Sequence, residues 1–99
     1  MNFDEIIDKF IDFNNIEVIK VEQYSPDTIL TLLNIDNKKH ILVETDYFND
    51  RYETMHIKEA FELDAKQWLK PKDYSSKEYD APVYYNKETN VAYGLVVVK

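Results

Sequence analysis

Residues 1–14, MNFDEIIDKFIDFN, carry the pattern from which we derive the fold of the chain. Their apolar side chains recur at intervals of three and four residues, which places them on one stripe of an α-helix. These side chains are Phe3, Ile6, Ile7, Phe10 and Ile11. Asn2 is a suitable N-cap, with Glu5 three residues later as its capping-box partner. The predicted helix ends at Asn14–Asn15, because asparagine often closes a helix in the left-handed conformation.

The other side of this predicted helix is acidic. Asp4, Asp8 and Asp12 recur every four residues. Like charges at this spacing destabilise a helix by ~0.3 kcal/mol per pair. We interpret the row either as an acidic surface that docks on a basic partner or as an ordinary solvated helix face.

The charge of the chain is unevenly distributed. The 99 residues have a formal net charge of −7. Residues 1–50 contain 11 acidic and 4 basic residues, whereas residues 51–99 contain 8 of each, so the first half carries the whole excess. An acidic surface argues against direct binding of nucleic acid, since contact with phosphates requires Lys and Arg. It favours a basic protein partner, and the alternative is a mild acidity with no specific purpose.

The composition predicts a single soluble domain over residues 1–99. Hydrophobic residues make up 44% of the chain and it has no cysteine, which excludes disulfides, a thiol nucleophile and cysteine-ligated metal sites. The N-terminus lacks a basic stretch followed by an apolar run, and the longest wholly apolar run, Leu95–Val98, is far too short to span a membrane. We therefore expect a cytoplasmic protein.

A β-strand should follow the first helix. Ile16–Tyr24 is rich in Ile, Val and Tyr, and its alternation slips between Val18 and Ile19. The slip indicates either a bulge or a strand that is covered on both faces. Ser25-Pro26-Asp27 then forms a turn.

The next segment, Thr28–Ile35, is compatible with two structures. Ser25 and Pro26 would start a helix there, but the segment is short, apolar on both sides and contains β-branched residues, which favours a central strand. Asp36-Asn37-Lys38 then closes a hairpin into a strand over Lys39–Phe48. One face of that strand carries His40, Leu42, Glu44, Asp46 and Phe48.

The second half predicts four more elements. They are a strand over Tyr52–Ile57, a helix over Lys58–Leu69 that ends before Pro71, and a closing hairpin of Pro82–Tyr85 with Val91–Val98 after a polar loop over Lys70–Ala81. Gly94, the one glycine, marks a bulge or the close approach of another backbone. The order α-β-β-β-β-α-β-β predicts an α+β fold, in which the two helices pack on a mostly antiparallel sheet.

Candidate metal and catalytic residues are few. If the turn after Phe48 closes a hairpin, His40 and His56 approach each other beside Glu44, which gives a weak metal set with no ligand-spacing motif. Ordinary, partly exposed histidines are the simpler interpretation. The chain has no glycine-rich phosphate loop, nucleophile elbow or H-E-x-x-H motif. We therefore expect that the protein is not an enzyme and that it binds no metal and no cofactor.

The eight tyrosines fall into two groups. Tyr47, Tyr84, Tyr85 and Tyr93 lie in predicted strands, where β-propensity explains them. Tyr74 and Tyr79 lie in the polar loop and are better candidates for an interface. The predicted partner-binding set is Asp4, Asp8, Asp12, Glu44, Asp46, Tyr74 and Tyr79.

One short segment resembles a known family. Residues 41–47, ILVETDY, resemble a strand of the phage uracil-DNA glycosylase inhibitors, which are small acidic DNA mimics. The resemblance covers only these residues, in a common strand pattern, and it assigns the chain to no family.

Together these features predict a small acidic module that binds a basic protein and acts as a stoichiometric inhibitor, antagonist or immunity protein. A nucleic-acid enzyme or a toxin would be a suitable target. The alternative is an assembly subunit that pairs with a second copy through a sheet edge formed by the final strand.

Overall fold

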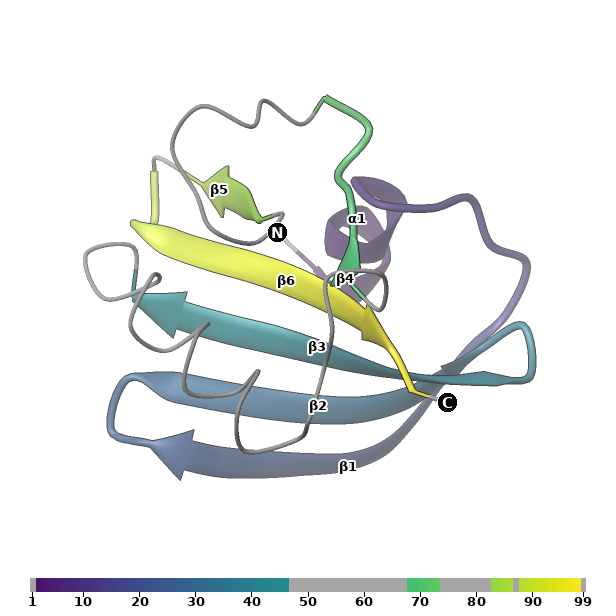
Figure 1. Ribbon diagram of the computed structural model, residues 1–99, viewed down its shortest axis with the longest axis horizontal. Helices are drawn as coiled ribbons and strands as arrows, with labels where there is room; N and C mark the ends of the chain where they lie inside the picture. The colour runs from purple at the N-terminus through teal and green to yellow at the C-terminus, as the bar shows by residue number, and fades with distance from the viewer. Residues whose placement is uncertain (1, 47–67, 74–82, 87, 99) are drawn as a thin grey trace.

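The computed structural model describes residues 2–46, 68–73, 83–86 and 88–98. These residues form one short helix and a mostly antiparallel six-stranded sheet, an α+β arrangement (Figure 1). The elements are α1 (Phe3–Asp8), β1 (Ile16–Ser25), β2 (Thr28–Ile35), β3 (Lys38–Asp46), β4 (Trp68–Leu69), β5 (Tyr84–Asn86) and β6 (Val91–Val97). Within these residues, no helix has the length and apolar composition needed to cross a membrane.

The predicted N-cap of α1 is confirmed. The side chain of Asn2 accepts a hydrogen bond of 2.9 Å from the backbone N–H of Glu5. This bond satisfies one of the N–H groups that the first turn of a helix leaves without a partner. The predicted apolar stripe is also confirmed, because Ile6, Ile7 and Phe10 are buried in the core and Phe3 and Ile11 pack against it.

The predicted end of this helix, Asn14–Asn15, is wrong, because α1 ends at Asp8. Contacts with distant residues hold the backbone groups that a longer helix would use itself. The carbonyl of Lys9 accepts a bond from the N–H of Lys72, and the carboxylate of Asp36 accepts from the N–H groups of Asn14 and Asn15. The segment after Asp8 therefore continues as an irregular chain rather than as helix.

Three long strands form the first half of the sheet. The predicted central strand Thr28–Ile35 is confirmed as β2, which pairs antiparallel with β1 and with β3. The predicted hairpin turn is confirmed at Asp36 and Asn37, whose φ values of 49° and 69° are typical of a type I′ turn. This turn sets the register in which Ile35 lies opposite Lys38.

The predicted irregularity in the first strand is also confirmed. The register of β1 against β2 shifts between Val18 and Lys20, so Ile19 is the extra residue of a bulge. A second shift lies between Gln23 and Ser25. Both shifts lie on β1, at one edge of the strands that the structure describes.

The other half of the sheet is built on β6. The strand order β1-β2-β3-β6-β4 places β6 in the interior, and β5 also pairs with β6 (Figure 1). β4 lies beside Leu95 and Val96, whereas β5 lies beside the segment from Val91 to Tyr93. The predicted closing hairpin is thus confirmed. The prediction that the final strand forms a free sheet edge is wrong, because β3 and the two short strands occupy both of its sides.

The predicted second helix is wrong at its C-terminal end. Trp68 and Leu69 form strand β4 opposite Val96 and Leu95 instead. Backbone pairing with β6 outweighs the helical spacing of these two side chains. The remainder of that helix, the predicted strand Tyr52–Ile57, and the residues Tyr47, Phe48, His56, Tyr74 and Tyr79 lie outside the described residues.

Both faces of the central strands are apolar. On the face under α1, the cluster contains Ile6, Ile7, Phe10, Leu33, Ile35, Leu42, Tyr93 and Leu95. On the opposite face, Leu30, Val43, Trp68 and Val96 form a second buried cluster. Burial of apolar surface contributes roughly 25 cal/mol per Å² to the stability of the fold. Each face therefore stabilises the sheet only where other side chains cover it.

Gly94 provides the space that the indole of Trp68 occupies. A Cβ atom built on Gly94 would lie 2.6 Å from Cζ3 of Trp68. The predicted close approach of another backbone is wrong, because the group that approaches Gly94 is the side chain of Trp68. The residues paired with β3 follow one another without a shift through Gly94, so the alternative of a bulge is wrong.

We expect Gly94→Ala to destabilise the protein by about 1–3 kcal/mol, since the new methyl group overlaps a buried ring. In a Trp68→Phe background the same change should cost less than half as much, because phenylalanine lacks the outer ring of the indole. The two free energies of unfolding can be measured by urea denaturation followed by far-UV circular dichroism. Equal costs in both backgrounds would contradict the packing of Trp68 on Gly94.

Candidate interaction surface

The three aspartates of the predicted acidic row do not lie on one helix. Asp4 is exposed in the first turn of α1, Asp8 is its last residue, and Asp12 follows it in an irregular segment. Nζ of Lys72 lies 3.5 Å from Oδ1 of Asp8 and 2.8 Å from Oδ1 of Asp12. One lysine thus bridges two of the three carboxylates.

This contact alters the electrostatics of the acidic row. The hydrogen bond from Lys72 and its positive charge lower the pKa of Asp12. The same bond raises the pKa of Lys72. Sequence spacing missed this lysine, because Lys72 lies 60 residues after Asp12 in the chain. The row therefore presents less negative charge than its sequence indicates.

We expect Lys72→Met to return the pKa of Asp12 to the ordinary aspartate range, because the substitution removes both the bond and the charge. Carboxyl chemical shifts followed by NMR across an acid titration would measure the change. The urea midpoint should move little, since exposed ion pairs contribute little to stability. An unchanged pKa of Asp12 would show that Lys72 does not hold it in solution; Lys39→Met, another exposed lysine, is the control.

Glu44 lies on the same sheet face as α1, opposite Ile29 on β2 and Tyr93 on β6. It is half-buried, and burial raises its pKa above the usual 4.5. Burial also raises the pKa of Tyr93, and the nearby charge of Glu44 adds to that rise. Asp46 is the last residue of β3. These two acids thus lie on the sheet itself, rather than in the cluster around Lys72.

A pair of tyrosines borders Glu44. The rings of Tyr84 and Tyr93 stack with centroids 6.2 Å apart, and Nζ of Lys9 lies 5.5 Å from the centroid of Tyr84. The prediction that these tyrosines serve sheet packing is confirmed by their places in β5 and β6. His40 is buried on this face, and its Nδ1 lies 2.8 Å from the carbonyl oxygen of Lys38. Among the described residues, no three metal-ligating side chains cluster.

Because the pKa of Glu44 is raised in the folded state, its ionisation opposes folding. Stability attributable to this group is present below the ordinary pKa of 4.5 and is lost as the pH rises through the raised value. We therefore expect Glu44→Gln to raise the urea midpoint at neutral pH relative to acid pH. It should also lower the pKa of Tyr93. Glu17→Gln, on exposed β1, should change neither the urea midpoint nor the pKa of Tyr93. A lower urea midpoint for Glu44→Gln at neutral pH would contradict this account.

Strand β1 exposes the large aliphatic side chains that the rest of the described sheet buries. Val18, Ile19 and Val21 are 47%, 46% and 60% exposed. β1 pairs with β2 on one side, and among the described strands none pairs with its other side (Figure 1). A strand edge with exposed aliphatic side chains is the feature to which another chain can add a strand.

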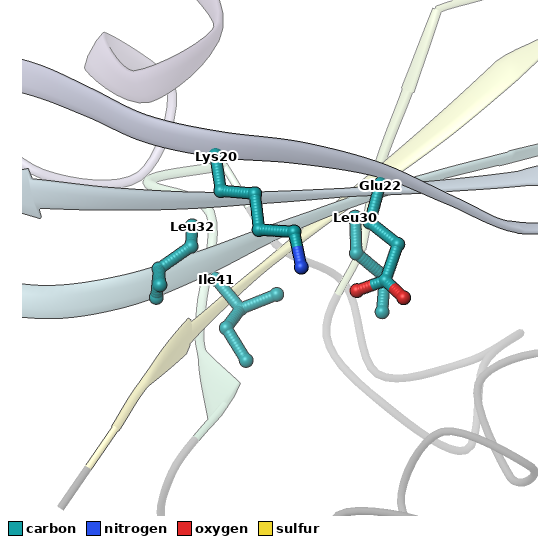
Figure 2. Close-up of a pocket in the computed structure, with 5 residues that line it drawn as sticks. All are labelled: Lys20, Glu22, Leu30, Leu32 and Ile41. Atoms are coloured by element: carbon teal, nitrogen blue, oxygen red, sulfur yellow. The ribbon is translucent and has the colours of Figure 1, made fainter.

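The face of β1 opposite to Val18 and Val21 borders a hollow. Lys20 and Glu22 project from β1 to the side on which Leu30, Leu32 and Ile41 lie, and these five residues line the hollow (Figure 2). Leu32 and Ile41 are only partly buried there. An apolar floor with one cation and one anion at its edge is typical of a contact surface rather than of a reactive centre.

The edge was missed because the sequence gives no strand order. The alternation of Ile16–Tyr24 predicts a strand, but its position at an edge depends on pairing with distant segments. The slip between Val18 and Ile19 was the one available signal, since bulges are frequent at sheet edges. The chain matches no family model, and comparisons with curated proteins and with solved structures give no significant match.

Proposed function

We propose that this protein is a protein-binding module that acts by stoichiometric binding and receives its partner along the edge of β1 that no described strand occupies. The observation that carries the proposal is the exposure of Val18, Ile19 and Val21 on an edge strand of ten residues. Contiguous exposed aliphatic residues on a soluble surface mark sites that another chain covers. The proposal assigns no reaction to the module.

The partner would bind by strand addition. Main-chain hydrogen bonds along this edge supply a general attraction, and side chains on the two faces supply specificity. On one face these are Val18 and Val21, and on the other Lys20 and Glu22 flank the hollow. A partner would thus bury the aliphatic side chains and place groups of its own beside both charges.

The net charge of −7 favours a basic protein as the partner, in the manner of an inhibitor, an antagonist or an immunity protein. In this role Asp4, Glu44 and Asp46 would steer the encounter, whereas Lys72 already offsets part of the charge of Asp8 and Asp12. Tyr74 and Tyr79 remain candidate anchors. The cysteine-free composition suits a reducing cytoplasm, where we propose that the module acts.

We expect Val21→Lys to abolish binding of the partner, because it places a hydrated ammonium group in the centre of the contact. The fold should be retained, since substitutions of exposed residues change stability by about 0.5 kcal/mol or less. The measurement is affinity capture from a lysate of the cells that encode the protein, read by mass spectrometry at low and high salt. Asn15→Lys, which adds the same charge at an exposed site outside β1, is the matched control.

A protein that is retained in stoichiometric amount by the natural chain and by Asn15→Lys, but not by Val21→Lys, would support binding through β1. Retention by all three would move the contact away from β1. Loss at high salt would indicate a charge-steered partner, whereas retention at high salt would indicate that apolar burial dominates. Retention of no protein by any of them, with the chain itself monomeric, would contradict the proposed function.

A further inference from the structure

The regular part of β1 is short and carries opposite charges. Between its two irregularities, Lys20–Gln23 pairs residue by residue with Ile29–Leu32 of β2. Lys20 and Glu22 lie on the hollow side of this stretch, and Val21 lies on the side of α1. When an identical stretch runs antiparallel beside this one, the cation of each copy can lie opposite the anion of the other. The stretch is therefore complementary to itself.

Geometry limits how this stretch can pair with an identical one. A two-fold axis that relates two antiparallel edge strands runs perpendicular to the sheet, so each face continues into the same face of the second copy. Two residues that oppose each other must then lie on the same face of the sheet. The axis must therefore lie midway between the two copies of one residue. An axis at Lys20 would oppose two ammonium groups, and an axis at Glu22 would oppose two carboxylates, which is unfavourable in either case.

An axis at Val21 has neither defect. It opposes Val21 to itself and brings each Lys20 opposite Glu22 of the other copy, on the same face. An axis at Gln23 would carry the pairing at once into the irregular step between Gln23 and Ser25, whereas an axis at Val21 keeps Lys20–Glu22 within the regular stretch. From this self-complementarity we infer that the chain which completes β1 is a second copy of this protein, paired antiparallel about a two-fold axis at Val21. The inference rests on the proposed use of this edge, and it replaces the basic protein there by a second copy of the chain.

This pairing would also cover the surfaces that β1 leaves open. The two Val21 side chains, each 60% exposed in the single chain, would contact each other on the side of α1. On the opposite face, the two hollows would adjoin across the axis, with the Lys20 and Glu22 pairs over an apolar floor (Figure 2). The pairing satisfies backbone groups, aliphatic side chains and charges in one contact.

The main force that opposes this dimer is repulsion between two acidic chains. Each copy has a net charge of −7, but exposed charges are screened over about 8 Å at physiological ionic strength. The residues at the axis are balanced, with one cation and one anion from each copy. A regular stretch of only four residues buries little area, so the dimer should be reversible and depend on concentration.

Charge exchange across the axis is the sharpest test. Lys20→Glu brings carboxylates opposite carboxylates, and Glu22→Lys brings ammonium groups opposite ammonium groups, so each should weaken dimerisation at least tenfold. The double variant Lys20→Glu/Glu22→Lys restores opposite charges and should return the dissociation constant to within about threefold of the natural value. Sedimentation equilibrium over a range of concentrations measures all four proteins. Glu17→Lys changes the net charge as Glu22→Lys does, but outside the paired stretch, and is the control.

A cross-link provides a second, independent measurement. The chain has no cysteine, so Val21→Cys introduces one thiol per chain. The two thiols would lie opposite each other at the axis, where the Cα separation of about 4.5–5.5 Å in an antiparallel pair suits a disulfide. Oxidised glutathione, which supplies the oxidant, should convert this variant into a covalent dimer. Lys20→Cys should not react so, because its two Cα atoms would lie about 8 Å apart by strand rise and spacing.

The outcomes separate this inference from the proposed function. A monomer at all concentrations, or a dimer that the charge variants do not affect, would overturn self-pairing at Val21. If that monomer still captures a different protein in a manner sensitive to Val21→Lys, the module binds a different chain and the proposed function stands. A dimer that the double variant fails to restore, or that Lys20→Cys cross-links more readily than Val21→Cys, would exclude this register.

Discussion

The structure depends on the fact that its central strands are apolar on both faces. Leu33 and Ile35 of β2 face α1, while Leu30, from the same strand, lies in the opposite cluster. A sheet of this kind is stable only where something covers each face. α1 and the irregular segment after it cover one face, and on the other the indole of Trp68 lies over Gly94. The need for cover accounts for the packing of α1 on one face and for the space that Gly94 leaves for Trp68 on the other.

The exposed residues of β1 follow from the same constraint. Coverage by α1 is centred on β2, β3 and β6, so Val18 and Val21 lie beyond it at the edge. The two irregularities of β1 are a device by which edge strands commonly limit uncontrolled pairing. Between them, a short regular stretch remains with a balanced pair of charges. The irregularities at the ends of this stretch disfavour pairing there, whereas its centre is complementary to an identical strand. Such an edge pairs with one partner in one register better than with arbitrary strands.

Sequence reasoning succeeded where the determinants are local. The asparagine cap, the slip at Val18 and Ile19, and the positive-φ turn at Asp36 and Asn37 each depend on a few neighbouring residues, and all three are confirmed. It failed where distant segments compete. Asp36 and Lys72 bind the backbone that would have extended α1, and β6 draws Trp68 into a strand. The same division between local and distant determinants holds for the candidate site. Neither the bridge from Lys72 to Asp12 nor the edge position of β1 can be predicted from the spacing of residues in the sequence.

Amide hydrogen exchange in β1 tests the central claim, that this edge is completed by another chain, most directly. Exchange of the amides of residues 20–23 would be followed at a low and a high concentration of the purified protein, with the buried amides of β3 as an internal reference. If a second copy completes the edge, those amides of β1 that point away from β2 should become protected as the concentration rises, while β3 stays unchanged. Protection that appears with concentration elsewhere in the molecule, and not in residues 20–23, would contradict the account.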